Sequence, residues 1–202
     1  MPLYIIRHGE TDSNRERIVQ TPQTPLSVLG QQQARQLAQR FLHVPISKII
    51  CSDYLRTQQT AAPIVQQFKC AIEYSALLRE RNLGDLRGLS YDDIADDFHH
   101  ENYVPKNGES DEQFSVRVAQ AWRFVLQQCE PNQDPIIVMT HGLVLRELVR
   151  NHLYTNDPSQ LAQATYQNTS VIEVDIKDKK TIVALCDVSH LTTDSAVNGG
   201  IA

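Results

Sequence analysis

Four short apolar runs, separated by stretches of helical periodicity, constrain the fold of this chain more than any other feature. They cover residues 3–6, 47–52, 71–74 and 135–140. Each run is rich in β-branched or aromatic side chains, which is typical of a buried strand. Because strands alternate with helices, the pattern predicts a sheet whose strands are mainly parallel and are joined by crossover helices.

The intervening stretches define the expected helices and one further strand pair. We expect a helix over residues 31–42 with an N-cap at Ser27, and a second one that is capped by Ser52 or Asp53 and runs through Val65. Three more helices are expected over residues 91–98, from 109–112 through Leu126, and over 143–153. Residues 169–176 and 181–187 are joined by a charged turn, which predicts an antiparallel hairpin. The predicted fold class is therefore α/β, a three-layer sandwich with a mainly parallel, mixed β-sheet flanked by helices.

The length of the chain bounds its domain organisation. A chain of 202 residues can bury one sizeable core but is short for two. We expect a single catalytic domain over residues 1–188. Residues 189–202 are dominated by Thr, Ser, Asn and Gly, which favours a flexible C-terminal tail.

Composition excludes several classes of partner and cofactor. A formal net charge of −5 argues against a nucleic-acid-binding protein, and no apolar stretch is long enough to span a bilayer. The N-terminus lacks the pattern of a secretory signal, and the four cysteines form no CxxC pair. We therefore expect a cytoplasmic protein with reduced thiols and with no metal site or cofactor. The sequence leaves open whether it forms a homo-oligomer.

Polar side chains follow each of the four early strands. Arg7 and His8 come directly after the first, Arg56 follows the second, Glu80 the third and His141 the fourth. An Arg-His pair after one strand would ordinarily be a loop feature. Because the carboxyl ends of parallel strands lie along one edge of a sheet, we expect all five side chains to meet in one site.

These residue types suit phosphoryl chemistry. Two arginines match the oxygens of a phosphate, and a neutral histidine can attack phosphorus. We therefore expect Arg7 and Arg56 to bind a phosphoryl group and His8 to be the nucleophile. A second group of residues would assist: His141 and Asn14 as hydrogen-bond donors, and Glu80 as the acid that protonates the leaving oxygen.

Other polar residues are expected to have no catalytic role. The expected solvated arginines are Arg15, Arg17 and Arg87, and the expected non-functional histidines are His43, His99, His100, His152 and His190. The segment 84–88 lacks the ending of a phosphate-binding P-loop, so its glycines are expected to serve backbone geometry.

The order of these motifs resembles the histidine phosphatase superfamily, which includes phosphoglycerate mutases, fructose-2,6-bisphosphatase and α-ribazole phosphatase-like enzymes. The matching segments are Leu3–Thr11 with Asn14, Pro25–Ser27 with Gly30, Ser52–Ala61, Leu78–Gly88, Thr140–Gly142 and Asn168–Val171. The resemblance implies a phosphoglycerate mutase-like fold with an Arg-His-Gly motif. It also implies the following roles: His8 as phosphorylated nucleophile, Arg7, Arg56 and His141 as the phosphate pocket, Asn14 and the backbone of Gly142 as further phosphate contacts, and Glu80 as proton donor.

Two departures from the mutases favour the phosphatase branch of this family. The mutases usually carry a long basic insertion between the acid and the second histidine, whereas residues 81–140 here number only 60 and residues 82–134 are net acidic. Gln20 stands where the mutases have a different loop, and it looks like the residue of bisphosphatase-type members, which implies a contact with substrate. We therefore expect a metal-independent, histidine acid-type phosphatase that hydrolyses phosphomonoesters of small metabolites. A cofactor-dependent phosphoglycerate mutase and a non-catalytic phosphate-binding module are the alternatives.

Overall fold

The first strand, β1 (Pro2–Arg7), lies inside a six-stranded sheet and is covered on both faces. The structure is a computed structural model and describes residues 2–94, 103–130, 133–177, 179–192 and 195. The other strands are β2 (Lys48–Cys51), β3 (Ala71–Tyr74), β4 (Ile136–Thr140), β5 (Val171–Asp175) and β6 (Thr181–Asp187). Their order across the sheet is β3-β2-β4-β1-β5-β6.

The sheet is mixed, as the sequence predicts. Strands β1, β4, β2 and β3 pair in parallel, with Arg7 opposite Thr140 and Cys51 opposite Met139. Strand β5 pairs antiparallel with β1 and with β6, so the predicted hairpin is confirmed. The parallel pairing brings the carboxyl ends of β1, β2 and β4 to the same edge of the sheet.

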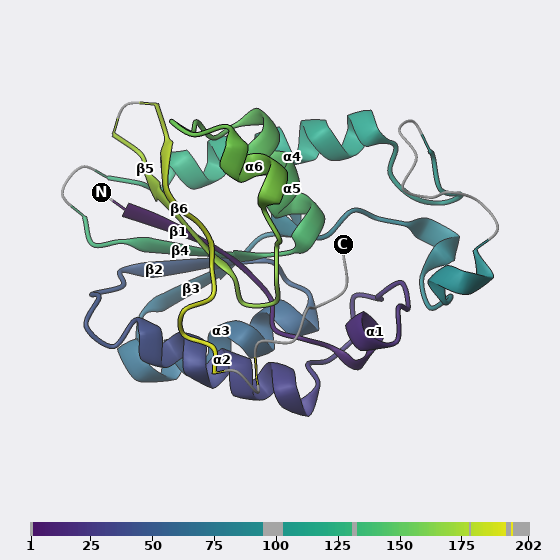
Figure 1. Cartoon of the computed structure of the whole chain (residues 1–202), viewed down its shortest axis with the longest axis horizontal. Coiled ribbons are helices and arrows are strands. Elements are labelled where there is room, and N and C mark those ends of the chain that lie inside the picture. The colour runs from purple at the N-terminus through teal and green to yellow at the C-terminus, as the bar shows by residue number, and fades with distance from the viewer. Residues whose placement is uncertain (1, 95–102, 131–132, 178, 193–194, 196–202) are drawn as a thin grey trace.

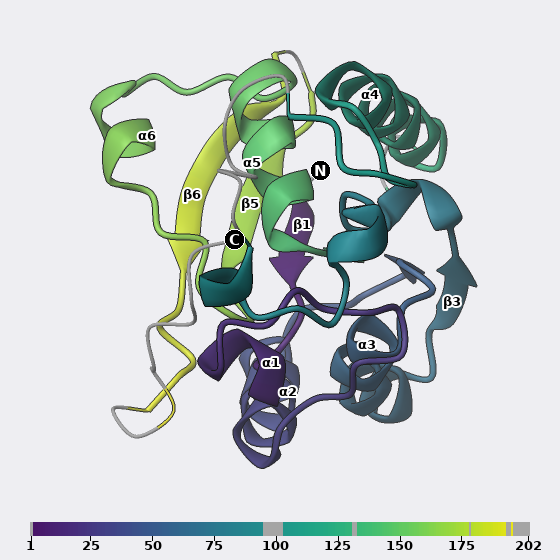
Figure 2. The same ribbon diagram turned by 90° about the vertical axis from the view of Figure 1, so that its right-hand side faces the viewer.

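Helices cover both faces of this sheet (Figure 1). On one side lie α2 (Val28–Arg40) and α3 (Leu55–Phe68), and on the other lie α4 (Asp111–Gln127) and α5 (Gly142–Asn151). Two short helices, α1 (Asp12–Arg15) and α6 (Ser159–Gln163), and three 3-10 turns, η1 (Ala76–Leu78), η2 (Gly84–Leu86) and η3 (Tyr91–Asp93), complete the described elements. Seen along the sheet, the two helical layers enclose the strands as a three-layer sandwich (Figure 2).

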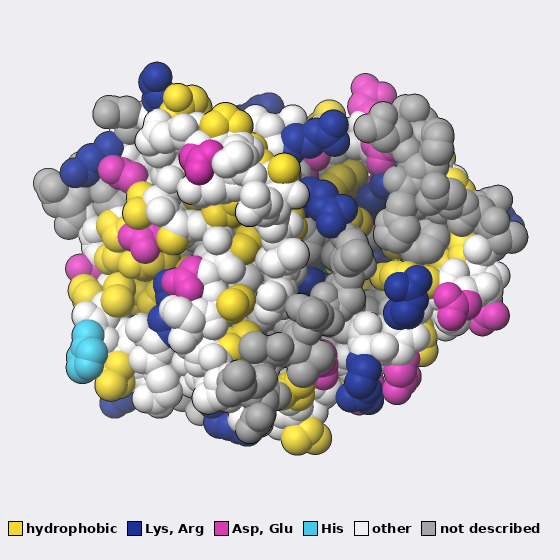
Figure 3. Space-filling view, in the orientation of Figure 1, with side chains coloured by type: hydrophobic (Ala, Val, Ile, Leu, Met, Phe, Trp, Pro, Cys, Tyr) yellow, Lys and Arg dark blue, Asp and Glu magenta, His cyan; other side chains and the backbone are white. Residues whose placement is uncertain are grey.

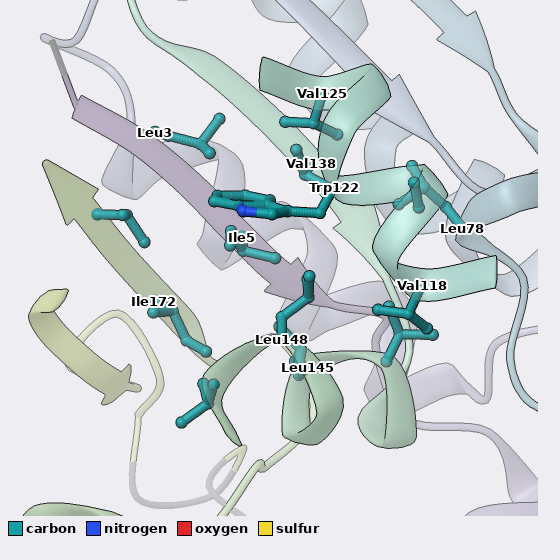
Figure 4. Packing of buried hydrophobic residues seen from close by; sticks show 14 of the residues in the cluster. Leu3, Ile5, Leu78, Val118, Trp122, Val125, Val138, Leu145, Leu148 and Ile172 are labelled. Carbon is teal, nitrogen blue, oxygen red and sulfur yellow. The ribbon is translucent and has the colours of Figure 1, made fainter. Parts of the chain in front are cut away.

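Alternating side chains of β1 divide the core into two halves. Leu3 and Ile5 face α4 and α5, where they pack around Trp122, while Tyr4 and Ile6 face α2 and α3. Figure 4 shows the first half, with the indole of Trp122 lying over β1. Because side chains along a strand point to opposite faces in turn, a run that is apolar at every position needs a helical layer on each side.

Capping side chains begin two of the long helices. The hydroxyl of Ser27 accepts a hydrogen bond from the amide of Gly30, as predicted for α2. Helix α4 starts with a reciprocal capping box between Ser110 and Gln113. The predicted cap of α3 is wrong: this helix follows Tyr54 without a side-chain cap. The hydroxyl of Ser52 bonds His141 and accepts from the amide of Tyr54 at 3.4 Å.

The connection after β3 departs furthest from the sequence prediction. In place of a helix over 91–98, the structure has only the turn η3, and residues 95–98 lie outside the described part. The segment 84–88 does serve backbone geometry, because Gly84 and Gly88 both have positive φ. A Cβ on Gly84 would lie 2.0 Å from the carbonyl oxygen of Lys106, so only glycine fits there.

Part of the predicted tail lies against α2. Arg40 donates to the hydroxyl of Ser189 at 2.9 Å, and the backbone oxygen of Ser195 accepts from the amide of Gln33 at 2.9 Å. Ser195 is buried. The division into a domain over 1–188 and a tail stays a prediction.

The helices of the described ranges include none that is both long and apolar enough to cross a membrane.

Candidate active site

His8 is held at the carboxyl end of β1 mainly through its backbone. Its amide donates to the carbonyl oxygen of Thr140 on β4 at 3.0 Å. Its carbonyl oxygen accepts from the amide of Thr169 at 3.2 Å and from the side-chain amide of Asn168 at 3.0 Å. Strand β4 on one side of β1 and the segment before β5 on the other therefore both fix this residue, which is 2% exposed.

The His8 ring has a defined tautomer. Its Nδ1 lies 2.7 Å from the carbonyl oxygen of Gly9, which can only accept, so Nδ1 carries the proton. Nε2 therefore has a free lone pair when the ring is neutral. Burial lowers the pKa of His8 well below its ordinary value of 6.5, and the charges of Arg56 and Arg7 lower it further. The ring is consequently a neutral base at physiological pH.

Arg7 and Arg56 supply two buried positive charges beside this ring. Arg7 donates to the carbonyl oxygen of Tyr166, and Arg56 donates to that of Thr21 at 2.9 Å. The Nε atom of each guanidinium is buried and has no hydrogen-bond partner in the described structure. Burial lowers the pKa of Arg56 to about 10, against the opposing effect of the Glu80 carboxylate. Two buried cations with unused donors would bind an anion.

His141 faces His8 across the site. The two ring centroids are 5.3 Å apart, and His141 is fully buried at the boundary between β4 and α5. Its Nε2 is hydrogen-bonded to the hydroxyl of Ser52 at 2.8 Å, while its Nδ1 has no partner among the described residues. Burial and the charge of Arg56 also lower the pKa of His141 well below 6.5. Gly142 is the first residue of α5, so the positive end of that helix lies at the site.

Glu80 lies at the same edge of the sheet, after η1. One carboxylate oxygen accepts from the amide of Arg81 at 3.0 Å, and the other accepts from the amide of Leu143 in the first turn of α5 at 3.1 Å. The carboxylate interacts electrostatically with both Arg7 and Arg56. The structure thus brings together all five polar residues that follow the four early strands.

Asn14 and Gln20 line the loop between β1 and α2. The side-chain oxygen of Asn14 accepts from Thr11, which caps α1, and from the side-chain amide of Asn168 at 3.4 Å. The side-chain oxygen of Gln20 is buried and has no partner in the described structure. Asn14 is therefore tied to the loop that holds His8, and Gln20 has unused hydrogen-bonding capacity.

Sequence reasoning missed three supporting residues. Asn168 links His8 to Asn14, Ser52 holds His141, and the hydroxyl of Thr60 accepts from the amide of Gly9 at 2.9 Å. All three belong to segments that match the family pattern, which was the available signal. Their partners lie 51 to 160 positions away in the sequence, so no local pattern identifies what they hold.

The other histidines that the structure describes lie outside this cluster. His43 is exposed, and His152, the residue directly after α5, is half-buried. His190 is also half-buried and bonds the hydroxyl of Thr169 at 3.1 Å, and burial lowers its pKa to about 4. His99 and His100 lie outside the described residues.

Positive charge gathers at and around the site (Figure 3). On the face shown in Figure 3, Lys and Arg side chains gather around the region between α5 and α1. Within the described ranges, no group of three or more His, Cys, Asp or Glu side chains is arranged to hold a metal ion. The cluster combines two buried arginines, a neutral imidazole with a free lone pair and a carboxylate, which is a set able to bind and transfer a phosphoryl group.

Comparison with known families decides the identity of the chain. A family model described as histidine phosphatase superfamily (branch 1) matches residues 3–188. The chain belongs to this superfamily. The match spans every element from β1 to β6 and includes all of the polar residues at the sheet edge.

Named relatives of this histidine phosphatase fall into two groups. A protein of Schizosaccharomyces pombe named "Probable phosphatase" is 32% identical, covering 96% of this chain and 97% of its own. An Enterobacter protein named "Probable phosphoglycerate mutase" is also 32% identical, covering 95% of each chain. The solved structure of the α-ribazole phosphatase from Shigella flexneri has a TM-score of 0.78 at 24% identity, over 93% of this chain and 96% of its own. The last likeness shows that the fold is phosphoglycerate mutase-like.

Proposed function

We propose that this chain is a metal-independent, histidine acid-type phosphatase that hydrolyses phosphomonoesters of small metabolites through a phosphohistidine at His8. One observation carries the proposal. The Nδ1 proton of His8 is committed to Gly9, so the neutral ring presents the lone pair of Nε2 beside two buried arginines.

Substrate binding follows from the charges of the pocket. The guanidinium groups of Arg7 and Arg56 would hold the phosphoryl oxygens, with help from His141 and from the amide of Gly142 at the start of α5. Asn14 and Gln20 would contact substrate from the loop after β1. Because the pocket is buried, these contacts act with little competition from water.

The first chemical step forms the phosphoenzyme. Nε2 of His8 attacks phosphorus in line with the ester oxygen, so a P–N bond forms while the P–O bond breaks. The carboxylic acid of Glu80 gives its proton to the leaving oxygen. His141 donates to an equatorial oxygen, which stabilises the transition state.

The second step restores the enzyme. The Glu80 carboxylate, left unprotonated by the first step, takes a proton from a water molecule that attacks the phosphohistidine. The P–N bond breaks, inorganic phosphate forms, and Glu80 is protonated again. The low pKa of His8 supports this cycle, because the ring must leave as neutral imidazole in a site with two arginines.

The test is phosphate release from 4-nitrophenyl phosphate, with and without a chelator. The substitution His8→Ala should lower kcat/KM by at least about a thousandfold, because no other group can form the intermediate. The control is His43→Ala, which removes an exposed histidine and should change nothing. Full activity in His8→Ala would overturn the nucleophile assignment, and loss of wild-type activity with the chelator would overturn metal independence.

A phosphoglycerate mutase is the second candidate, because a relative at 32% identity carries that name. The two functions share the phosphohistidine and differ in what removes the phosphoryl group. Incubation with 3-phosphoglycerate and 2,3-bisphosphoglycerate distinguishes them: a phosphatase releases inorganic phosphate, whereas a mutase isomerises the substrate without release. Binding without either reaction would indicate a non-catalytic phosphate-binding module.

We also propose a cytoplasmic location. All four cysteines are free thiols. Cys51 and Cys186, the first and the last of them in the sequence, lie in different strands of the sheet. Free thiols are typical of proteins in reducing compartments.

A further inference from the structure

Two loops that are distant in sequence pair beside the phosphate pocket. Ile18 forms an antiparallel bridge with Ser90, and Val19 both accepts from the amide of Gly88 at 2.8 Å and donates to the carbonyl oxygen of Leu89 at 2.9 Å. Continuing the register of the Ile18–Ser90 bridge places residue 21 opposite residue 87. The loop after β1 and the loop after η2 therefore form one wall.

This wall touches the pocket at two points. The carbonyl oxygen of Thr21 accepts from the guanidinium of Arg56, and Arg87 donates to the hydroxyl of Tyr54 at 2.9 Å. The ring of Tyr54 lies 5.1 Å from the guanidinium of Arg56 and packs edge-on against His141, with centroids 5.3 Å apart. Arg87 is thus separated from the pocket by a single side chain.

Arg87 differs from the solvated side chain expected from the sequence. It is half-buried, and the one hydrogen bond of its side chain among the described residues goes to an uncharged phenol. Four other arginines near this wall are each paired with an aspartate: Arg15 with Asp12, Arg17 with Asp92, Arg79 with Asp53, and Arg81 with Asp111. Arg87 has no ion pair with any carboxylate that the structure describes, and its charge acts on Arg56.

A second feature of the wall points to a ligand. The side-chain oxygen of Gln20 is buried without a partner, one residue before Thr21. In the segment after η2, which forms the other half of the wall, Tyr91 interacts electrostatically with both Glu80 and Arg7. Residues of the wall therefore lie within electrostatic reach of Glu80, which is the acid in the proposed mechanism.

We propose that Arg87 binds a second anionic group carried by the leaving alcohol, so that the preferred substrates are phosphomonoesters with a further carboxylate or phosphate. This inference rests on the proposed function. An arginine with unused donors matches either anion, because both offer two oxygens to the planar guanidinium. Tyr54 holds the Arg87 side chain in place, and Gln20 is positioned to bind a hydroxyl or amine of the same leaving group.

The experiment measures binding to matched probes, in the His8→Ala background so that nothing is hydrolysed. The first pair is 3-phosphoglycerate and glycerol 3-phosphate, which differ by a carboxylate; the second is fructose 1,6-bisphosphate and fructose 6-phosphate, which differ by a phosphate. Calorimetry should give a tighter Kd for the more anionic member of at least one pair. The added substitution Arg87→Gln should shrink that preference by about tenfold, the size expected for a lost charge-assisted hydrogen bond.

Two further variants separate a specific contact from a general effect. Arg35→Gln removes one positive charge from the exposed face of α2 and should leave the preference unchanged. Tyr54→Phe keeps the ring but releases Arg87, so it should reduce the preference even if Arg87→Gln folds poorly. Equal weakening of both members of a pair, or no preference in either pair, would overturn the inference.

Failure of the proposed function has a different signature. If the otherwise unaltered protein released no phosphate from 4-nitrophenyl phosphate, the proposed hydrolysis would fall, while the binding preference could still be measured. If hydrolysis of 4-nitrophenyl phosphate depended on His8 but Arg87→Gln left the binding preference intact, only the role of Arg87 would fall.

Discussion

At the scale of single residues, the site works through burial. His8, His141, Arg7 and Arg56 are each at most 2% exposed, and two permanent cations stand beside two rings. Burial lowers the pKa of Arg56 only to about 10, and guanidinium groups stay protonated in proteins, so the arginines keep their charge. Burial also lowers the pKa of both histidines, which become neutral. The result is a pocket that is positive in total and yet contains a neutral nucleophile.

Glu80 should matter most for substrates with a poor leaving group. In Glu80→Gln, 4-nitrophenyl phosphate should still phosphorylate the enzyme, because nitrophenolate leaves without protonation. Rapid mixing should show a burst of about one equivalent of nitrophenolate, followed by slow turnover as water attack becomes limiting. An alkyl phosphate should show no burst. Equal losses on aryl and alkyl phosphates would contradict the role of Glu80 as acid.

Ser52 is expected to position His141. The substitution Ser52→Ala removes the hydrogen bond to Nε2 and leaves a buried ring nitrogen without a partner, which costs about 1–3 kcal/mol. We expect kcat to fall about tenfold with little change in KM, because the affected contact forms in the transition state. Ser47→Ala, at the other end of β2, is the matched control. A fall in stability with unchanged kcat would reduce Ser52 to a structural role.

At the scale of secondary-structure elements, the close approach of α2 to the end of β1 shapes the site. A Cβ on Gly30 would lie 2.0 Å from the carbonyl oxygen of Glu10, and one on Gly9 would lie 2.8 Å from that of Gly30. The side chain of Glu10 also accepts from the hydroxyl of Ser27 at 2.8 Å. The start of α2 therefore supports the loop that follows His8.

Gly30→Ala should disturb this contact. The added methyl group must push α2 away from the loop, and overpacking of this kind costs about 1–3 kcal/mol. Urea denaturation should show a lower free energy of unfolding. The kcat/KM should fall as well, because the displaced loop directly follows His8. Gln31→Ala, the next residue and exposed, should change neither by much. A Gly30→Ala variant as stable and active as the original would show that the helix can shift freely.

At the scale of the whole molecule, burial of neutral histidines should make stability depend on pH. His8 and His141 have folded pKa values well below 6.5, so the unfolded chain binds more protons as pH falls below 6.5. Below pH 6.5, each of these histidines lowers the free energy of unfolding by about 1.4 kcal/mol per pH unit. Between pH 7.5 and 5.5 the pair therefore lowers it by about 3 kcal/mol. The free energy of unfolding is highest above pH 6.5 and is lost on acidification.

Urea titrations at pH 7.5 and 5.5 measure this loss. The variant His141→Gln removes one of the two titrating rings, so it should lose about 1.4 kcal/mol less than the original protein between these pH values. Carboxylates such as Asp53 and Glu109 titrate in both proteins and cancel in the comparison. An identical pH dependence in the two proteins would show that His141 is protonated in the folded state.

The element pattern could be read from the sequence because it depends on local spacing. Every predicted strand is present, and α2, α4 and α5 lie where their periodicity places them. The prediction failed where polar side chains choose between local and distant partners. Ser52 is a plausible helix cap by position, yet its hydroxyl bonds His141, which lies between β4 and α5, 89 positions away. The acidic segment from Tyr91 has weak periodicity, and only a short turn forms there in the described residues.

The sequence by itself determined the fold class, the mixed sheet and the polar residues that its strands carry to one edge, because hydrophobic periodicity and strand direction are properties of each segment. Tertiary structure alone decided the direction of the pKa shifts of those polar residues and which other residues contact them. The lowered pKa of His8, the link from Asn168 and the hydrogen bond from Arg87 to Tyr54 all arise from contacts between distant segments. Such contacts exist only after the core has packed, since burial creates the desolvation that keeps His8 neutral and gives each hydrogen bond its partner.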